Sequence, residues 1–224
     1  MAKQELDEGL EINSGSGGRA RGSLFETVIS VVKFTLSILL LPLVWGLTVS
    51  FSQEFSNQSQ DIINNFVLAI AAYLILHMFI YEPNTIYKFG QRLISGMFGF
   101  IAPLRDLLSC AVPFYTVLTF GLYFIFKANF AYEVIIGYFI FWISFTAVMH
   151  LILTAAYMKE ETTDTLKGNY FFTLFLVYMF EIVLISVFFN VMLKDFSFVN
   201  IIKSGGKFFI DTHTAIFKQL FVMK

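Results

Sequence analysis

Five long apolar segments constrain this chain more than any other feature. They are residues 28–51, 62–81, 107–126, 134–157 and 170–193, and each is almost free of charged side chains. A bilayer core ~30 Å thick needs about 20 mostly apolar residues per helix, and every segment meets that length. Each is apolar all round rather than alternating, which favours helices over the strands of a membrane barrel. We therefore predict an all-α integral membrane protein with a bundle of five transmembrane helices.

The composition excludes most other classes of protein. The chain is 57% hydrophobic and 14% charged, whereas an average soluble domain is ~25% charged. A soluble enzyme and a secreted disulfide scaffold are therefore excluded, and the single cysteine, Cys110, cannot form a disulfide within the chain. The net charge of -1 provides no field for a polyanion, so no nucleic acid is expected as a partner. Membrane lipids are the expected surroundings.

The chain divides into three regions. Residues 1–22 contain four acidic residues and then a Ser/Gly run, and we expect a flexible cytoplasmic tail. Residues 23–193 form the transmembrane domain, and Ser23 and Glu26 match a capping box at its start. Residues 194–224 form an amphipathic tail. The N-terminal tail lacks the pattern of a signal peptide, so the first span is expected to be an uncleaved anchor.

Proline and glycine predict three breaks in these helices. Pro42 and Pro113 fall inside the first and third spans, and each predicts a kink. Gly205 and Gly206 predict a hinge in the C-terminal tail.

Lysine and arginine predict the orientation. Eight of them fall in segments that are inside if the N-terminus is cytoplasmic, and only Lys127 falls in the opposite loops. Asn57-Gln58-Ser59 matches a glycosylation sequon, but such triplets often occur by chance and nothing else marks a eukaryotic secretory protein. A bacterial cytoplasmic membrane is the expected location. Five spans then place residues 194–224 outside, although this tail carries five lysines. A re-entrant segment near residues 196–210 would instead return the end of the chain to the inside.

Two extramembrane segments are amphipathic. Residues 84–104 carry apolar side chains every three or four positions, which predicts an interfacial helix whose Lys88 and Arg92, with the following Arg105, contact anionic lipid. This helix is either an anchoring connector or a coupling helix for a cytoplasmic partner. The tail has an apolar stripe that suits the membrane surface, a partner subunit or a second copy of the chain. The stripe includes Phe208, Phe209, Ile216 and Leu220.

Titratable side chains within the spans are the candidate functional residues. A charge at the bilayer centre costs at least ~2.5–3.5 kcal/mol, and Glu181 is the deepest, near the middle of the fifth span. Lys33, His77 and His150 fall in other spans and could join it in a buried polar cluster. Lys33 or a histidine would then pair with Glu181. The alternatives are that Lys33 extends to the interface, that the histidines bond local groups, and that Glu181 only joins helices.

No catalytic constellation and no metal-ligand spacing occurs in the sequence, so we expect no enzyme activity and no cofactor. The leading hypothesis is a non-enzymatic integral subunit of a larger membrane complex, which provides a scaffold or a docking surface for other protein subunits. The alternative is a small transporter or channel, for lipid, for an ion or coupled to protons, that uses Glu181 with His77 or His150 as its polar path.

Overall fold

The computed structural model describes residues 16–79, 84–101, 105–161 and 168–221, and this part of the chain is helical without strands. The all-α fold is therefore confirmed. The helices are α1 (Ser16–Ser56), α2 (Gln60–Phe79), α3 (Asn84–Met97), α4 (Arg105–Ala111), α5 (Phe114–Lys127), α6 (Tyr132–Glu161), α7 (Gly168–Met192) and α8 (Phe198–Phe221).

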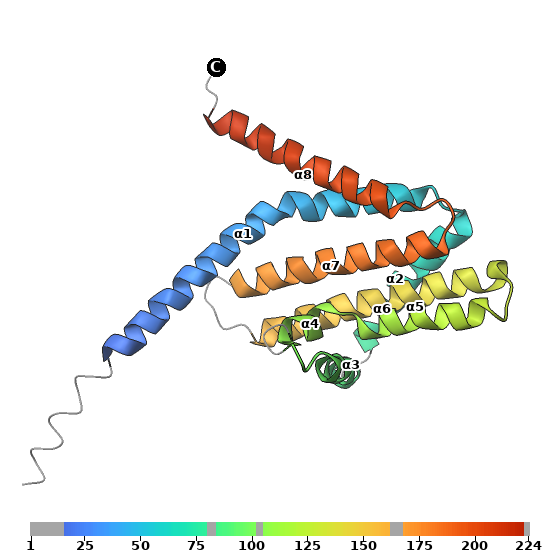
Figure 1. Ribbon diagram of the computed structural model, residues 1–224, viewed down its shortest axis with the longest axis horizontal. Helices are drawn as coiled ribbons and strands as arrows, with labels where there is room; N and C mark the ends of the chain where they lie inside the picture. Colours follow the sequence, from blue (N-terminus) through green and yellow to red (C-terminus); the bar gives the residue numbers. More distant parts are fainter. Residues whose placement is uncertain (1–15, 80–83, 102–104, 162–167, 222–224) are drawn as a thin grey trace, which may run out of the picture.

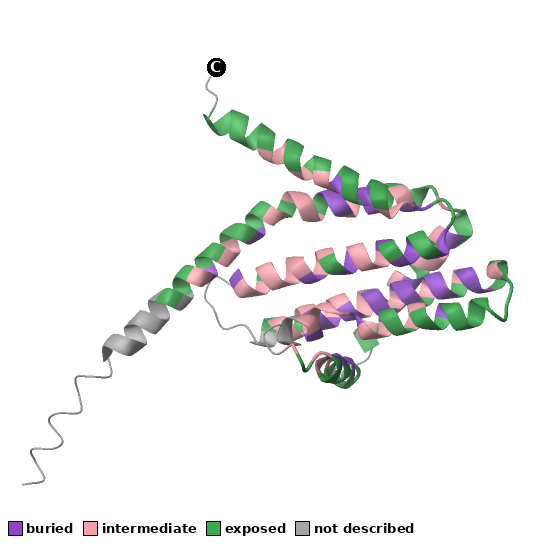
Figure 2. Cartoon of the chain, in the orientation of Figure 1, coloured by how far each residue is buried: buried purple, intermediate pink, exposed green. Residues whose placement is uncertain are grey.

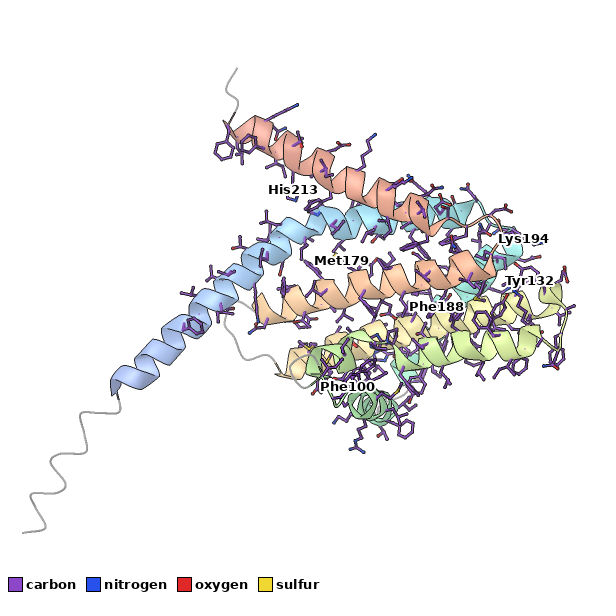
Figure 3. The ribbon with its side chains drawn as sticks, in the orientation of Figure 1. Phe100, Tyr132, Met179, Phe188, Lys194 and His213 are labelled. Atoms are coloured by element: carbon purple, nitrogen blue, oxygen red, sulfur yellow. The ribbon has the colours of Figure 1, made fainter. Side chains whose placement is uncertain are left out.

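The long helices lie side by side, and the chain reverses direction from one to the next (Figure 1). The connections 57–59, 128–131 and 193–197 gather at one end, which we call the short-loop end. The other end carries α3 and α4, and we call it the α3 end. At the short-loop end, the Lys194 ammonium lies 5.8 Å from the centroid of the Tyr132 ring (Figure 3).

Four helices are long and apolar enough to cross a membrane. They correspond to the predicted spans 28–51, 62–81, 134–157 and 170–193, with slightly shifted ends. Their ranges are Thr27–Ser56, Gln60–Phe79, Tyr132–Lys159 and Gly168–Met192.

The predicted span 107–126 is divided into two helices rather than kinked. The segment forms α4 and α5, which are separated at Val112 and Pro113. Proline has no N–H to donate and disfavours helical geometry in the residue before it, so the helix ends there. With 14 residues, α5 is about 21 Å long, which is shorter than a bilayer core.

Two pairs of helices form the body of the bundle. One pair is α1 with α7 and the other is α2 with α6, while α5 packs against α6. At the short-loop end, phenylalanine rings from α1, α2, α7 and the following loop close the core with centroid separations of 4.5–6.4 Å. They are Phe51, Phe55, Phe66, Phe189 and Phe196. Buried residues accordingly concentrate on α6 and α7 and near the short-loop end of α1 (Figure 2).

The first helix starts earlier than the capping box predicts. It begins at Ser16, so Ser23 and Glu26 lie within it and part of the predicted flexible tail is helical; residues 1–15 lie outside the described residues. A serine and a glutamate three positions apart are equally compatible with a helix interior, so the pattern does not fix the start. Pro42 lies inside α1, and the helix changes direction along its length (Figure 1).

The tail helix α8 packs antiparallel on α1. Near the short-loop end, the Asn200 amide donates to Glu54 Oε1 at 2.8 Å, and further along, His213 Nε2 donates to Leu39 O at 3.0 Å. Figure 3 shows His213 between the two helices. Leu39 directly follows the residue whose carbonyl loses its helical partner because Pro42 has no N–H. The histidine therefore supplies a donor beside the proline break.

The predicted hinge at Gly205 and Gly206 is wrong, because α8 is continuous through both residues. Gly205 is buried against α1, where an added Cβ would lie 2.8 Å from Leu47 Cδ2 and 3.1 Å from Leu47 N. On the facing helix, a Cβ at Gly46 would lie 2.9 Å from the Gly205 carbonyl oxygen. Small residues let two helix backbones approach closely, so this glycine serves packing rather than bending.

The interfacial helix is shorter than predicted, since α3 ends at Met97 rather than at residue 104. It has three faces. Tyr87, Gly90 and Ile94 are buried against the bundle, and Lys88 and Arg92 are exposed on a polar face. The third face is apolar and exposed, as expected for a helix whose apolar side meets lipid. Its residues are Ile86, Phe89, Leu93 and Met97.

Candidate intramembrane site at Glu181 and His150

Glu181 and His150 meet in the interior of the bundle. Glu181 lies on α7 and has no exposed surface, and His150 lies on the neighbouring α6 and is 7% exposed. His150 Nδ1 and Glu181 Oε2 are 3.1 Å apart, which makes a hydrogen bond between the two helices. A buried carboxylate requires such a partner, because lipid and apolar side chains cannot solvate it.

Two further side chains extend this contact toward the α3 end. His150 Nε2 lies 3.4 Å from Thr154 Oγ1, and Thr154 Oγ1 lies 2.9 Å from the Tyr87 hydroxyl on α3. Burial raises the pKa of the Tyr87 phenol, so this hydroxyl remains neutral. Glu181, His150, Thr154 and Tyr87 thus form one polar chain from α7 through α6 to α3, which we call the polar chain.

Sequence reasoning missed half of the polar chain. His150 and Thr154 are four positions apart, so their shared helix face could have been predicted from the sequence. Tyr87 gave no such signal, because its burial depends on how α3 docks against α6. The face that α3 turns to the bundle is not the most apolar one.

One oxygen of Glu181 is left without a partner. Within the described residues, Oε1 is buried and makes no hydrogen bond. Whichever of His150 Nδ1 and Glu181 Oε2 carries the proton between them, Oε1 remains an acceptor. A buried acceptor without a donor costs ~1–3 kcal/mol, so the site has capacity for one further hydrogen bond.

A cavity of about 460 Å³ lies beside this pair, between α1, α2, α6 and α7. Glu181 and Tyr178 belong to its lining, and most of the other lining side chains are apolar. Ser52 and Ser56 on α1 and Val67 on α2 are exposed lining residues, so the cavity opens between these two helices. The volume falls within the ~300–1,000 Å³ of small-molecule pockets.

The other predicted members of the polar cluster lie elsewhere. Lys33 donates to Asn169 Oδ1 at 2.6 Å near the start of α7, so the predicted alternative of a Lys33–Glu181 pair is not formed. The long lysine stem carries its ammonium to a polar group near the helix end instead. His77 Nδ1 lies 3.5 Å from the Tyr73 hydroxyl, one turn away on α2. It therefore bonds locally and does not join Glu181.

The candidate contact residues lie on the surface. Lys88 and Arg92 are exposed on α3, and Arg105 is the first residue of α4, although its side chain lies outside the described part. On α8, Ile216 and Leu220 are exposed. Phe208 and Phe209 are partly covered, since Phe208 contacts Gly46 of α1 and Phe209 packs on the His213 ring at 4.4 Å.

The fold and this site define the class as an all-α integral membrane protein with a buried Glu–His pair. Among the described residues, no group of three or more potential metal-binding side chains occurs. No protein family matches the chain, and no curated protein or solved structure is significantly similar to it.

Proposed function

We propose that this protein is a non-enzymatic integral subunit of a larger membrane complex, and that it binds its partner through α8. One observation carries this proposal: an uninterrupted stripe of exposed polar residues runs along the side of α8 that faces away from α1. These residues recur every three or four positions, which places them on one helix face. We call them the polar stripe: Lys203, Ser204, Lys207, Asp211, Thr214 and Lys218.

The depth of α8 makes this stripe unusual. Its contacts with α1 run from Glu54 to Leu39, and both residues lie within the candidate membrane span Thr27–Ser56. Hydrocarbon cannot solvate lysine or aspartate at that depth. A partner helix with polar groups would satisfy the stripe. Because it holds three lysines and one aspartate, the complementary surface is acidic.

The location belongs to the same proposal. We place the protein in a bacterial cytoplasmic membrane with a cytoplasmic N-terminus, as the distribution of lysine and arginine favours. Because α8 runs back along α1, we also place the C-terminal end inside. An inside C-terminal end brings the lysines at the end of α8 to the side that the positive-inside rule prefers.

Photo-crosslinking tests the proposal. A photoreactive residue at position 207 or 214 should crosslink to another membrane protein in cells, whereas one at the exposed, lipid-facing Ile75 of α2 should not. Charge reversal by Lys203→Glu and Lys207→Glu should abolish the crosslink at position 214. Crosslinks to lipid alone, or to a second copy of the chain alone, would contradict an acidic partner subunit.

The alternative function, a small transporter, is supported by the Glu181–His150 pair beside the cavity. Under this hypothesis the cavity holds the substrate during transport. His77 takes no part, because its contact is with the Tyr73 hydroxyl on its own helix. Movement of a tail-labelled fluorescent phospholipid between the leaflets of proteoliposomes tests this for a lipid substrate. If the protein is a transporter, the unmodified protein should move the lipid faster than protein-free vesicles do, and Glu181→Gln should abolish this movement. If it is a scaffold, neither form should exceed protein-free vesicles.

A further inference from the structure

The wall that α6 gives to the cavity between α1, α2, α6 and α7 consists of three smaller side chains and Leu151. Ser144, Ala147 and Val148 lie three and four positions apart, so they occupy one face of the helix and line the cavity together. Larger residues there would fill the space. A chamber therefore lies between the α1–α7 pair and the α2–α6 pair, beside the direct contact of α6 with α7.

Three polar side chains in the wall of this chamber, Thr48, Tyr178 and Ser144, have already used their hydrogens. Thr48 Oγ1 donates to Val44 O at 2.7 Å, so the Tyr178 hydroxyl, 2.8 Å away, must be the donor to Thr48. Ser144 Oγ donates to Ile140 O at 2.7 Å. Tyr178 and Ser144 therefore offer only their oxygen lone pairs to the cavity.

Glu181 adds the strongest acceptor to this set. It lines the cavity, and its Oε1 is buried without a partner among the described residues. The chamber thus combines a mostly apolar wall with three oxygen acceptors and no free donor from these three side chains. A molecule that complements it has an apolar body and an N–H or O–H head group.

We infer that the cavity binds one amphiphile with an apolar chain and a hydrogen-bond-donating head, and that the head bonds Glu181 Oε1. The mouth between α1 and α2 admits it, because Ser52, Ser56 and Val67 are exposed there. Since the mouth lies within the membrane-crossing part of both helices, the amphiphile enters from the lipid phase. This inference does not depend on the proposed role of α8 in binding a partner. It names a class of ligand for the alternative function, the transporter.

Photolabelling in lipid nanodiscs tests this site. The probes are a twelve-carbon primary amine that carries a diazirine near its chain end and the matched alkane without the amine. We expect the amine to label cavity-lining residues of α1, α2, α6 or α7 about tenfold more strongly than the alkane, because a charge-assisted hydrogen bond adds at least this much affinity. Equal labelling by the two probes would contradict the inference.

Three variants separate the head-group contact from the cavity. Glu181→Gln keeps the size of the side chain but removes its negative charge, so the charge-assisted hydrogen bond to the amine is lost and amine labelling should fall about tenfold while alkane labelling is unchanged. Ala147→Leu fills the chamber and should reduce labelling by both probes. Ala156→Leu makes the same change at an exposed position of α6 and should alter neither. Unchanged amine labelling in either cavity variant would overturn the inference.

The wild-type comparison of the two probes and Ala147→Leu remain decisive if Glu181→Gln fails to fold. Binding and transport are also separable. Cavity labelling without movement of the fluorescent lipid supports the binding site and rejects the transporter hypothesis. Lipid movement that Glu181→Gln abolishes, without amine-dependent labelling, supports the transporter and rejects the donor-bearing ligand.

Discussion

At the scale of single residues, the Glu181–His150 pair has an energetic cost. Bringing a carboxylate and an imidazole out of water is expensive, and one hydrogen bond at 3.1 Å recovers only part of that cost. An apolar pair of the same volume would pack the bundle as well. The unpartnered Oε1 adds to that cost, because it is a buried acceptor without a donor among the described residues.

Removing one member of the pair should be worse than removing both. We expect His150→Ala to lower the free energy of unfolding by about 3–5 kcal/mol, because it leaves a buried carboxylate unpaired. The double variant His150→Leu, Glu181→Leu should recover most of that loss. Unfolding in mild detergent, followed by circular dichroism, measures both; additive losses in the double variant would show that the two side chains do not stabilise each other.

Tyr87 gives a milder test of how α3 docks. Tyr87→Phe removes the hydroxyl that lies 2.9 Å from Thr154 Oγ1 but keeps the ring, so we expect a loss of about 1 kcal/mol. Tyr115→Phe is a useful control, because it removes a more exposed hydroxyl, from α5, that donates to the Ile86 carbonyl on α3. A larger loss for Tyr115→Phe than for Tyr87→Phe in thermal unfolding would contradict the importance of the polar chain.

At the scale of elements, the sequence predicted the spans well and their partners poorly. Length and uniform apolarity located four membrane helices, since the bilayer imposes both properties on any spanning helix. The sequence could not predict whether Gly205 bends α8 or packs against Leu47, because the answer depends on which helix lies opposite. The same reason explains why the Lys33–Glu181 alternative failed and His150 was the partner.

The two adjacent glycines of α8 allow a matched comparison. We expect Gly205→Ala to weaken the α1–α8 contact by about 1–3 kcal/mol, since its Cβ meets the Leu47 backbone. Gly206→Ala faces open space and should stabilise the helix by up to about 1 kcal/mol. Distances between spin labels on α1 and α8 would report separation of the helices. Separation in Gly206→Ala, or none in Gly205→Ala, would contradict this packing.

At the scale of the whole molecule, the path of α8 decides on which side of the membrane the chain ends. Single cysteines at positions 57, 129 and 218, in a Cys110→Ser background, should react differently with a membrane-impermeant maleimide. Positions 57 and 129 share the short-loop end and should be labelled from one side, whereas position 218 should be labelled from the other. Labelling of positions 57 and 218 from the same side would contradict a tail that returns along α1.

The antiparallel contact of α8 with α1 also has a consequence for assembly. It joins the two helices that are farthest apart along the sequence, and contacts between distant segments form late because a long loop must close first. The contact between α1 and the whole of α8 therefore cannot form until synthesis has passed residue 221. A partner that recognises the polar stripe only on a docked α8 would thereby select finished bundles over unfinished ones.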